Sequence, residues 1–206
     1  MREKLNNSIF FGMLGNLLFI GFALVCILYH LTYDPKSGFS DFVAAIAYII
    51  EFCGFAFLAF SDYLIWNAVR DRKYLKIGYS VYILFEAVMM FMELNSYRIK
   101  FYSPYSMGLA IFHTFISAAI CFAFLQFDKD NKKYEYLVIA CIAIIAIGMF
   151  GSIIGIRIYF SILLNAIAFS LLFGGIRFLT NRGEIEIDCH GDNPRPAEYK
   201  SEFFKD

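Results

Sequence analysis

Six long apolar runs divide the chain, and short polar segments separate each run from the next. The hydrocarbon core of a bilayer requires about 20 apolar residues per helix, a length that these runs provide. The boundary between the last two runs is marked only by two glycines and Arg157 in "GSIIGIR". The pattern predicts an all-α fold, that of a polytopic membrane protein with a six-transmembrane-helix bundle. The predicted spans are approximately Ile9–Tyr29, Phe42–Trp66, Leu75–Leu94, Met107–Phe127, Tyr136–Gly155 and Ile156–Leu179.

The composition agrees with this pattern. Of the 206 residues, 60% are hydrophobic and 17% are charged, and the mean hydropathy is +0.61. An ordinary soluble domain has an apolar share of about half. We therefore expect an integral, multi-pass membrane protein that contacts membrane lipids and has no nucleic-acid partner.

Two parts of the chain differ in polarity. Residues 1–180 hold the apolar runs and are predicted to form the six-helix transmembrane domain. Residues 181–206 are polar and contain two prolines, so we expect a flexible cytoplasmic tail. Because the loops and the tail leave no room for a soluble catalytic domain, the bundle itself is expected to carry the function.

The distribution of Lys and Arg predicts the orientation of the spans. Of the 18 basic residues, 14 fall in the terminal segments and loops on one side of the predicted spans. Only four fall on the other side, namely Lys36, Arg98, Lys100 and Arg157. Basic residues are retained on the cytoplasmic side of membranes, so both termini are predicted to be cytoplasmic.

Four hydrogen-bonding side chains occur inside four different predicted spans. Glu51, Glu86, His113 and Asn165 each lie about 9 to 13 Å below the predicted outer end of their span, at the rise of an α-helix. An ionised carboxylate at the centre of a bilayer costs about 3 kcal/mol on insertion scales, so both acids are expected to face the bundle interior or water. There they must be paired, protonated or hydrated.

Two interpretations of this polar layer remain open. The first is a ligand-binding pocket that opens to the outer face, in which Glu51 and Glu86 accept a cation or a proton. In that pocket His113 titrates as their partner and the amide of Asn165 orients it. The second is structural: Glu86 and His113 only bond across adjacent helices, and Glu51 is held by Tyr48 or a buried water.

Asp62 is predicted to be an interfacial acid outside this layer. It lies near the inner end of the second span, where its carboxylate can reach water or Arg70. Tyr63 and Trp66 beside it are residue types that favour the membrane interface, so a carboxylate that extends to the membrane surface is the expected arrangement.

Glycines in the first and last spans are candidates for close helix contacts, because small residues allow helix backbones to approach in lipid. They are Gly12, Gly15 and Gly21 in the first span and Gly174 and Gly175 in the last. Glycine is also simply tolerated in membrane helices, and in that case these positions have no contact role.

No catalytic residue set, cofactor or metal site is predicted. The five cysteines form no CxxC pair, and "DCHGD" at Asp188–Asp192 offers metal-ligand types at loop spacing, whereas a structural zinc site needs four well-placed ligands. The chain also lacks HExxH, GxSxG, Walker and GxGxxG motifs.

The stretch "KIGYSVYILFEAVMMFMELNSYRIKFYSPYSMGLAIFHTFIS", Lys76–Ser117, places an acid midway along the third span, followed by an outer loop and a polar start to the fourth. With six spans and cytoplasmic ends, the chain resembles the six-span family of autophagy modulators and GPI-anchor remodelling factors. The resemblance implies a non-enzymatic accessory or regulatory subunit that acts through lipid or a membrane protein partner.

Two further hypotheses compete with that function. One is a small-molecule or ion transport component that uses the outer-facing polar pocket. The other is a membrane-embedded lipid hydrolase in which Glu51 or Asp62 acts as the acid or base. The absence of a catalytic set favours a non-enzymatic protein.

Overall fold

Six α-helices make up the regular structure of the residues that the computed structural model describes, which are 2–32, 38–69, 72–95, 104–125, 131–153 and 158–185. The predicted all-α fold and its six helices are therefore confirmed. The helices are α1 (Arg2–Thr32), α2 (Gly38–Ala68), α3 (Lys73–Asn95), α4 (Pro104–Phe124), α5 (Lys132–Ile153) and α6 (Ile158–Asn181). The predicted boundary at Gly155 and Ile156 lies outside the described residues.

Helix ends differ from the predicted ends because the helical backbone continues past the apolar run. α1 begins at Arg2, two turns before the first predicted apolar residue, Ile9. α2 likewise begins at Gly38 rather than Phe42. Hydrophobicity therefore located the centres of the helices, whereas intrahelical hydrogen bonding determines their ends.

Five helices are long and apolar enough to cross a membrane, with hydropathy peaks in α1, α2, α3, α5 and α6. Within the described residues, α4 contributes a shorter apolar stretch, Ile111–Phe124. The chain thus has the helical architecture of an integral multi-pass membrane protein.

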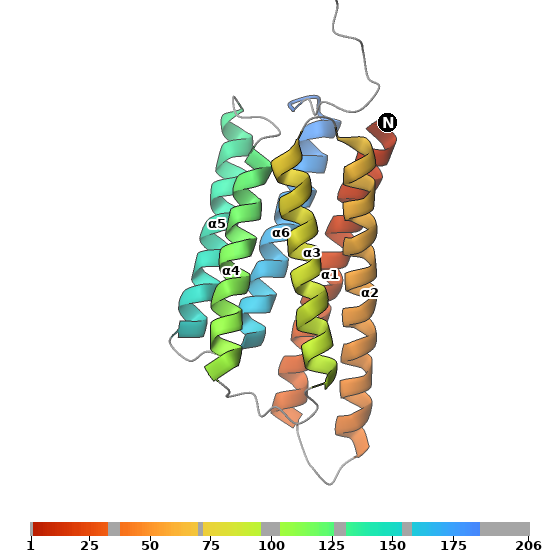
Figure 1. Cartoon of the computed structure of the whole chain (residues 1–206), viewed down its shortest axis with the longest axis vertical. Coiled ribbons are helices and arrows are strands. Elements are labelled where there is room, and N and C mark those ends of the chain that lie inside the picture. The colour runs from red at the N-terminus through yellow and green to blue at the C-terminus, as the bar shows by residue number, and fades with distance from the viewer. Residues whose placement is uncertain are drawn as a thin grey trace, which may run out of the picture.

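The helices form a closed ring (Figure 1). Each helix packs against its neighbours in sequence, α1 packs against α6 to close the ring, and α4 also contacts α6. The start of α1 and the end of α6 lie at the same end of the bundle (Figure 1). Successive helices run in opposite directions, so segments of α2, α3, α4 and α6 that are far apart in the sequence lie at one level of the bundle.

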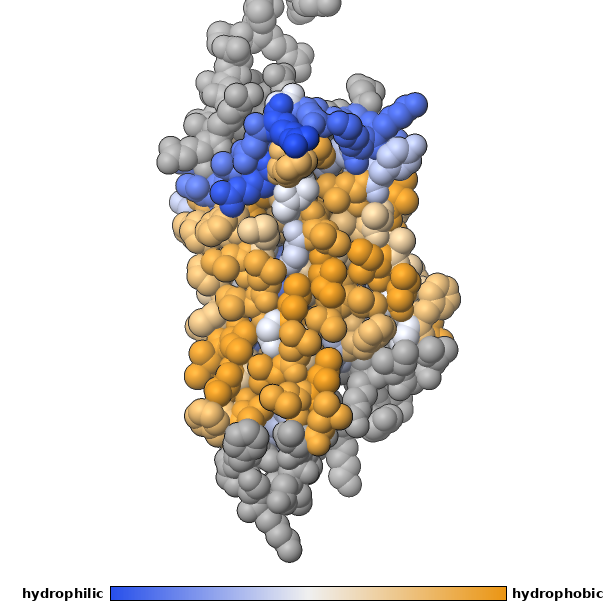
Figure 2. Space-filling view, turned by 180° about the vertical axis from the view of Figure 1, so that it is seen from behind, coloured by the Kyte–Doolittle hydropathy of each residue, from blue (hydrophilic) through white to orange (hydrophobic). Residues whose placement is uncertain are grey.

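The outer surface matches a lipid environment. Large apolar side chains are exposed along the whole bundle, for example Leu31 (77%), Leu84 (65%) and Phe150 (61%). Figure 2 shows one face on which hydrophobic residues cover most of the height and a hydrophilic belt lies at the end where α6 finishes. An exposed apolar surface of this extent would be unfavourable in water, and it is the expected surface of a membrane protein.

Three glycines allow close contacts of α1 with α2 and of α6 with α1 and α5. A Cβ at Gly15 would lie 2.9 Å from the Gly54 carbonyl oxygen, and a Cβ at Gly12 would lie 2.9 Å from the Phe173 ring. A Cβ at Gly175 would lie 2.3 Å from the Leu137 side chain. The contact role predicted for these positions is found, whereas Gly21 and Gly174 have only ordinary neighbours at 3.8 and 3.7 Å.

Two buried serines tie α1 to α2 in the half of the bundle nearest the N-terminus. The Ser8 hydroxyl donates to the Ser61 carbonyl at 2.8 Å, and the Ser61 hydroxyl donates to the Ser8 carbonyl at 2.9 Å. Such reciprocal bonds satisfy polar groups that lipid cannot satisfy, so they help to fix the register of the two helices.

α6 ends in a turn that returns the chain to α5. Gly183 has φ +68°, and the N–H groups of Gly183 and Glu184 donate to the carbonyls of Thr180 and Leu179. This is the Schellman pattern, which favours glycine at the left-handed position. Beyond the turn Ile185 is 2% exposed, so the first residues after α6 pack on the bundle.

Residues 186–206 lie outside the described residues. They include Cys189, His190 and the rest of "DCHGD". The flexible tail predicted for residues 181–206 therefore stays a prediction beyond Ile185.

We expect this C-terminal turn to be slightly less stable in acid. Lys133 Nζ donates to Glu184 Oε2 at 2.8 Å, and this hydrogen bond, followed by the charges of Lys133 and Arg182, lowers the pKa of Glu184 below its ordinary value of 4.5. A lowered carboxyl pKa adds stability above the ordinary value, and that stability is lost as the pH falls through the folded-state value. Hydrogen exchange, corrected for the intrinsic exchange rate at each pH, should show lower protection at Glu184 and Ile185 in acid, and Glu184→Gln should remove that pH dependence.

Candidate functional site

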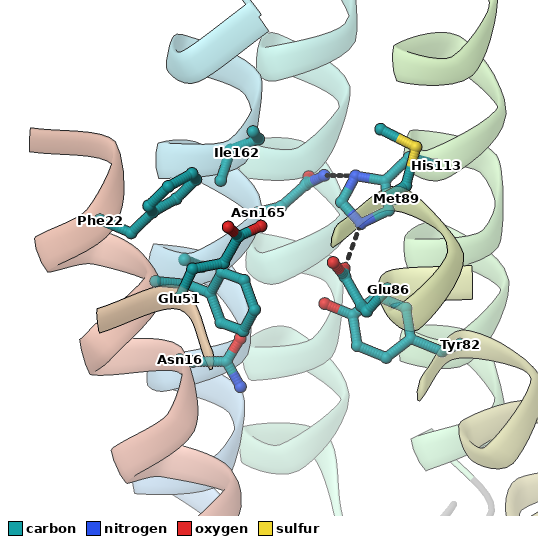
Figure 3. Close-up of a pocket in the computed structure, with 11 residues that line it drawn as sticks. Asn16, Phe22, Glu51, Tyr82, Glu86, Met89, His113, Ile162 and Asn165 are labelled. Carbon is teal, nitrogen blue, oxygen red and sulfur yellow. Dashed lines mark hydrogen bonds and ion pairs between the residues drawn. The ribbon is translucent and has the colours of Figure 1, made fainter. Parts of the chain in front are cut away.

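The four residues of the predicted polar layer line one cavity (Figure 3). Glu51 comes from α2, Glu86 from α3, His113 from α4 and Asn165 from α6. The cavity lies near the ends at which α4 and α6 begin, away from the start of α1. Other residues that line it are Asn16, Phe19, Phe22, Tyr82, Met89, Ile162 and Ala166.

Three of the four residues form one hydrogen-bonded chain across three helices. Asn165 Nδ2 lies 3.1 Å from His113 Nδ1, and His113 Nε2 lies 2.5 Å from Glu86 Oε1. If the Asn165 amide donates to Nδ1, then Nε2 carries the imidazole proton and donates to the carboxylate of Glu86. The bond predicted between Glu86 and His113 across adjacent helices is therefore present, and Asn165 extends it.

The imidazole of His113 is held in place by aromatic rings of α3. The ring of Tyr82 stacks on it with centroids 5.9 Å apart, and the ring of Phe85 does so at 5.6 Å. Both pairs are close to parallel, with interplanar angles of 15°. Stacking and hydrogen bonding both hold the imidazole ring of His113 in one orientation, so its two nitrogens point at Glu86 and Asn165.

Glu51 directs its carboxylate into the same cavity from the opposite side (Figure 3). It is 5% exposed, and the side chains of Glu86 and His113 are 11% and 9% exposed. Asn16 on α1 is 1% exposed, and its Nδ2 donates to the Gly12 carbonyl at 2.8 Å. The side-chain carbonyl oxygen of Asn16 takes no part in that bond.

The charges around the cavity favour a positive occupant. Among the described residues that line it there are two carboxylates, one imidazole and no lysine or arginine. With both carboxylates ionised, the site carries a net charge of −2 with neutral His113 and −1 with protonated His113. Negative charge in a low-dielectric interior is costly unless a proton or a cation neutralises it.

The size of the cavity limits the occupant. Its volume is about 30 Å³, enough for about two water molecules or a small ion with little hydration. Sites for drug-sized ligands begin at about 300 Å³. The cavity therefore fits protons, water and small cations and does not fit a lipid chain.

Asn16 and Tyr82 are lining residues that the sequence prediction omitted. Asn16 is an amide within an apolar run, the same signal that singled out Asn165. Tyr82 lies four residues before Glu86, which places both on one face of α3. The hydroxyl of Tyr82 lies beside the Glu86 carboxylate (Figure 3) and interacts with it electrostatically.

Asp62 does not belong to this cavity. It follows Glu51 by three helical turns on α2, a distance of about 16 Å. Ser80 Oγ donates to Asp62 Oδ2 at 2.8 Å, and Trp66 Nε1 donates to Ser80 Oγ at 2.7 Å. The carboxylate is therefore held by α3, and its predicted partner Arg70 lies outside the described residues.

The geometry gives no support to acid–base catalysis by Glu51 and Asp62. Their separation on α2 is too large for both to act on one bond. In the described part of the chain, no group of three or more His, Cys, Asp or Glu residues could hold a metal ion. The hypothesis of a lipid hydrolase that uses Glu51 or Asp62 alone as its acid or base stays a hypothesis.

No known protein family, curated protein or solved structure matches this chain. The resemblance of Lys76–Ser117 to the autophagy-modulator and GPI-anchor-remodelling family stays a hypothesis. What the fold and the cavity define is a class: a helical protein with several membrane-crossing helices and a buried acidic site between them.

Proposed function

We propose that this protein is a six-span membrane protein that binds a proton or a small cation in the cavity of Glu51, Glu86, His113 and Asn165. The observation that carries the proposal is the convergence of these side chains from four helices on one buried cavity without lysine or arginine. A purely structural Glu86–His113 bond does not require a second carboxylate on the opposite wall. The transport hypothesis accounts for both acids.

The proposed orientation has both termini in the cytoplasm and the cavity in the outer half of the membrane. Its support is the bias of 14 basic residues against 4 between the two sides, together with the hydrophilic belt at the end where α6 finishes (Figure 2). α4 has 21 residues, a length of about 31 Å, which is enough to cross the hydrocarbon core as the sixth span.

Replacing either acid by glutamine is expected to abolish the binding signal and leave the fold intact. Infrared difference spectra of the reconstituted protein report the carboxyl C=O stretch as the pH changes, or as sodium replaces a bulky organic cation. In the wild type we expect a pH-dependent or sodium-dependent band that Glu51→Gln and Glu86→Gln each remove. Glu135→Gln, an exposed acid at the start of α5, is the matched control and should leave the band unchanged.

The two glutamine variants also decide between the interpretations of the polar layer. If the spectra of both variants equal that of the wild type, the carboxyl groups do not bind protons or cations and the proposal is wrong. If only Glu86→Gln changes the spectrum, Glu51 has no part in the site.

A second candidate function is action through a lipid or a membrane protein partner, and exposed aromatic residues on α2 support it. Phe60 (45%), Tyr63 (63%) and Trp66 (45%) are exposed on one part of α2, and Phe11 of α1 packs edge-on against Phe60 at 4.9 Å. Aromatic strips of this kind are typical of partner contacts and of the membrane interface. Mass spectrometry of what stays bound after gentle detergent extraction would identify a stoichiometric partner, which would favour this function.

A further inference from the structure

Asn165 has one polar atom that no residue of the described structure satisfies. Its Nδ2 lies 3.1 Å from His113 Nδ1, whereas its Oδ1 is buried and has no hydrogen-bond partner among the described residues. The residue is 2% exposed, and it lines the cavity together with Glu51 and Glu86. A buried acceptor without a partner is costly, so this oxygen requires an occupant of the cavity that donates a hydrogen bond or carries a positive charge.

The orientation of the Asn165 amide follows from the groups on either side of His113. An ionised carboxylate only accepts hydrogen bonds, so His113 Nε2, which lies 2.5 Å from Glu86 Oε1, must carry a proton. In a neutral imidazole the other nitrogen, Nδ1, is then an acceptor and needs a donor. The amide can donate only through Nδ2, so its oxygen is turned away from the imidazole.

One added proton reverses this arrangement. A proton from solvent forms an N–H bond at His113 Nδ1, and the imidazole becomes a cation. Nδ1 can then no longer accept from Asn165 Nδ2, because two N–H groups would face each other. Rotation of the amide by about 180° brings Oδ1 to Nδ1 and turns Nδ2 toward the cavity. The hydrogen bond from Nε2 to Glu86 is kept, no covalent bond of the chain breaks, and no group is oxidised or reduced.

We propose that the cavity binds a small monovalent metal cation and a proton alternately, and that the amide of Asn165 makes the two exclusive. This inference rests on the proposed function of the cavity and specifies its substrates as a pair that exchange. In one state Asn165 Oδ1 and the carboxylates of Glu51 and Glu86 are the oxygen ligands of the cation. In the other state the proton is on His113 Nδ1, which donates to the same oxygen. Because an amide has a single oxygen, it cannot serve both occupants at once.

Charge and size favour a monovalent cation as the second occupant. The two ionised carboxylates give the site a charge of −2, and either one monovalent cation or one proton on His113 changes it to −1. Exchange of one for the other therefore leaves the buried charge unchanged. The cavity of about 30 Å³ holds a small ion without its hydration shell. The described residues contain no group of three His, Cys, Asp or Glu that could hold a metal ion, which argues against a divalent metal.

The titratable groups that face His113 come from α2 and α3. Glu86 of α3 bonds to Nε2, the Tyr82 ring of α3 stacks on the imidazole, and Glu51 of α2 faces it across the cavity (Figure 3). Among the described residues that line the cavity, the polar side chains of α1 and α6 are amides, and α5 contributes none. These three groups and the Asn165 amide therefore make up the polar surroundings of the imidazole in this part of the bundle.

Proton release on sodium binding tests the exchange. Sodium chloride is added to the full-length protein in detergent, in weakly buffered and mildly acidic solution. A pH-sensitive dye reports released protons, and radioactive sodium reports bound cation. For the wild type we expect about one proton released for each sodium bound, because occupancy by one excludes the other. Choline chloride, whose cation is too large for the cavity, should release none.

Substitutions of Asn165 test the shared oxygen. Asn165→Leu removes it, and we expect sodium to bind about tenfold or more weakly, since even indirect partners of a bound metal contribute about 10–100-fold in affinity. Asn165→Asp supplies two oxygens, one for the protonated imidazole and one for the cation, so we expect sodium binding with little proton release. Asn181→Leu, at an exposed position of the same helix, is the matched control and should behave like the wild type.

The infrared band of the cavity carboxyls separates the failure of the exchange from the failure of the site. If that band responds to pH or sodium but the wild type releases no proton on adding sodium, the exchange is wrong and the proposed site stands. The exchange is likewise wrong if Asn165→Leu binds sodium as tightly as the wild type, or if Asn165→Asp releases as many protons. If the band is absent, the site fails and the exchange fails with it. Thermal melting of each variant in detergent verifies that lost binding is not lost folding.

Discussion

Gly15→Ala is expected to lower the melting temperature of the detergent-solubilised protein by about 2–12 °C. The added Cβ would lie 2.9 Å from the Gly54 carbonyl oxygen, which belongs to the backbone of α2 and cannot rotate away. The two helices would have to separate, and the reciprocal bonds between Ser8 and Ser61 at 2.8 and 2.9 Å would lengthen with them. Overpacking of this kind costs about 1–3 kcal/mol.

Gly21→Ala on the same helix is the matched control. Its Cβ would meet only Ile50, at 3.8 Å, which is ordinary contact. Alanine is favoured over glycine in helices by about 1 kcal/mol, so this variant should melt at or above the wild-type temperature. Equal melting of Gly15→Ala and Gly21→Ala would show that α1 and α2 do not depend on a glycine contact.

His113→Leu is expected to destabilise the protein by about 3–5 kcal/mol near neutral pH. The substitution removes the partner that lies 2.5 Å from Glu86 and leaves that carboxylate in the cavity opposite Glu51. Chemical or thermal unfolding in detergent at neutral pH measures the loss.

The double variant Glu86→Leu with His113→Leu isolates the cause. It removes both members of the pair, and replacing a buried ion pair by apolar residues is often close to neutral. We therefore expect it to recover most of the stability that His113→Leu loses. If it is no more stable than His113→Leu, the loss comes from the cavity left by the imidazole and not from an unpaired charge.

Much of the candidate site was predictable from the chain because polar residues are expensive in lipid. Four polar residues interrupt apolar runs, namely Glu51, Glu86, His113 and Asn165. A helical rise of about 1.5 Å per residue predicts that they lie at about the same depth. Depth alone does not fix which way a side chain points. Asn16 has the same signal and was omitted, and the hydrogen bond from Ser80 of α3 to Asp62 was not predicted.

Hydrophobic periodicity by itself determined the helical class and the six helices of this protein, because a membrane requires long, internally hydrogen-bonded apolar segments. It also indicated that Glu51 and Glu86 must face away from lipid. The packing order of the helices determines which side chains meet. Because α1 packs against α6 and the six helices form a ring, the acids of α2 and α3 line the same cavity as the imidazole of α4 and the amide of α6. That arrangement depends on contacts between residues far apart in the chain, such as Gly15 with Gly54, and only the tertiary structure contains them.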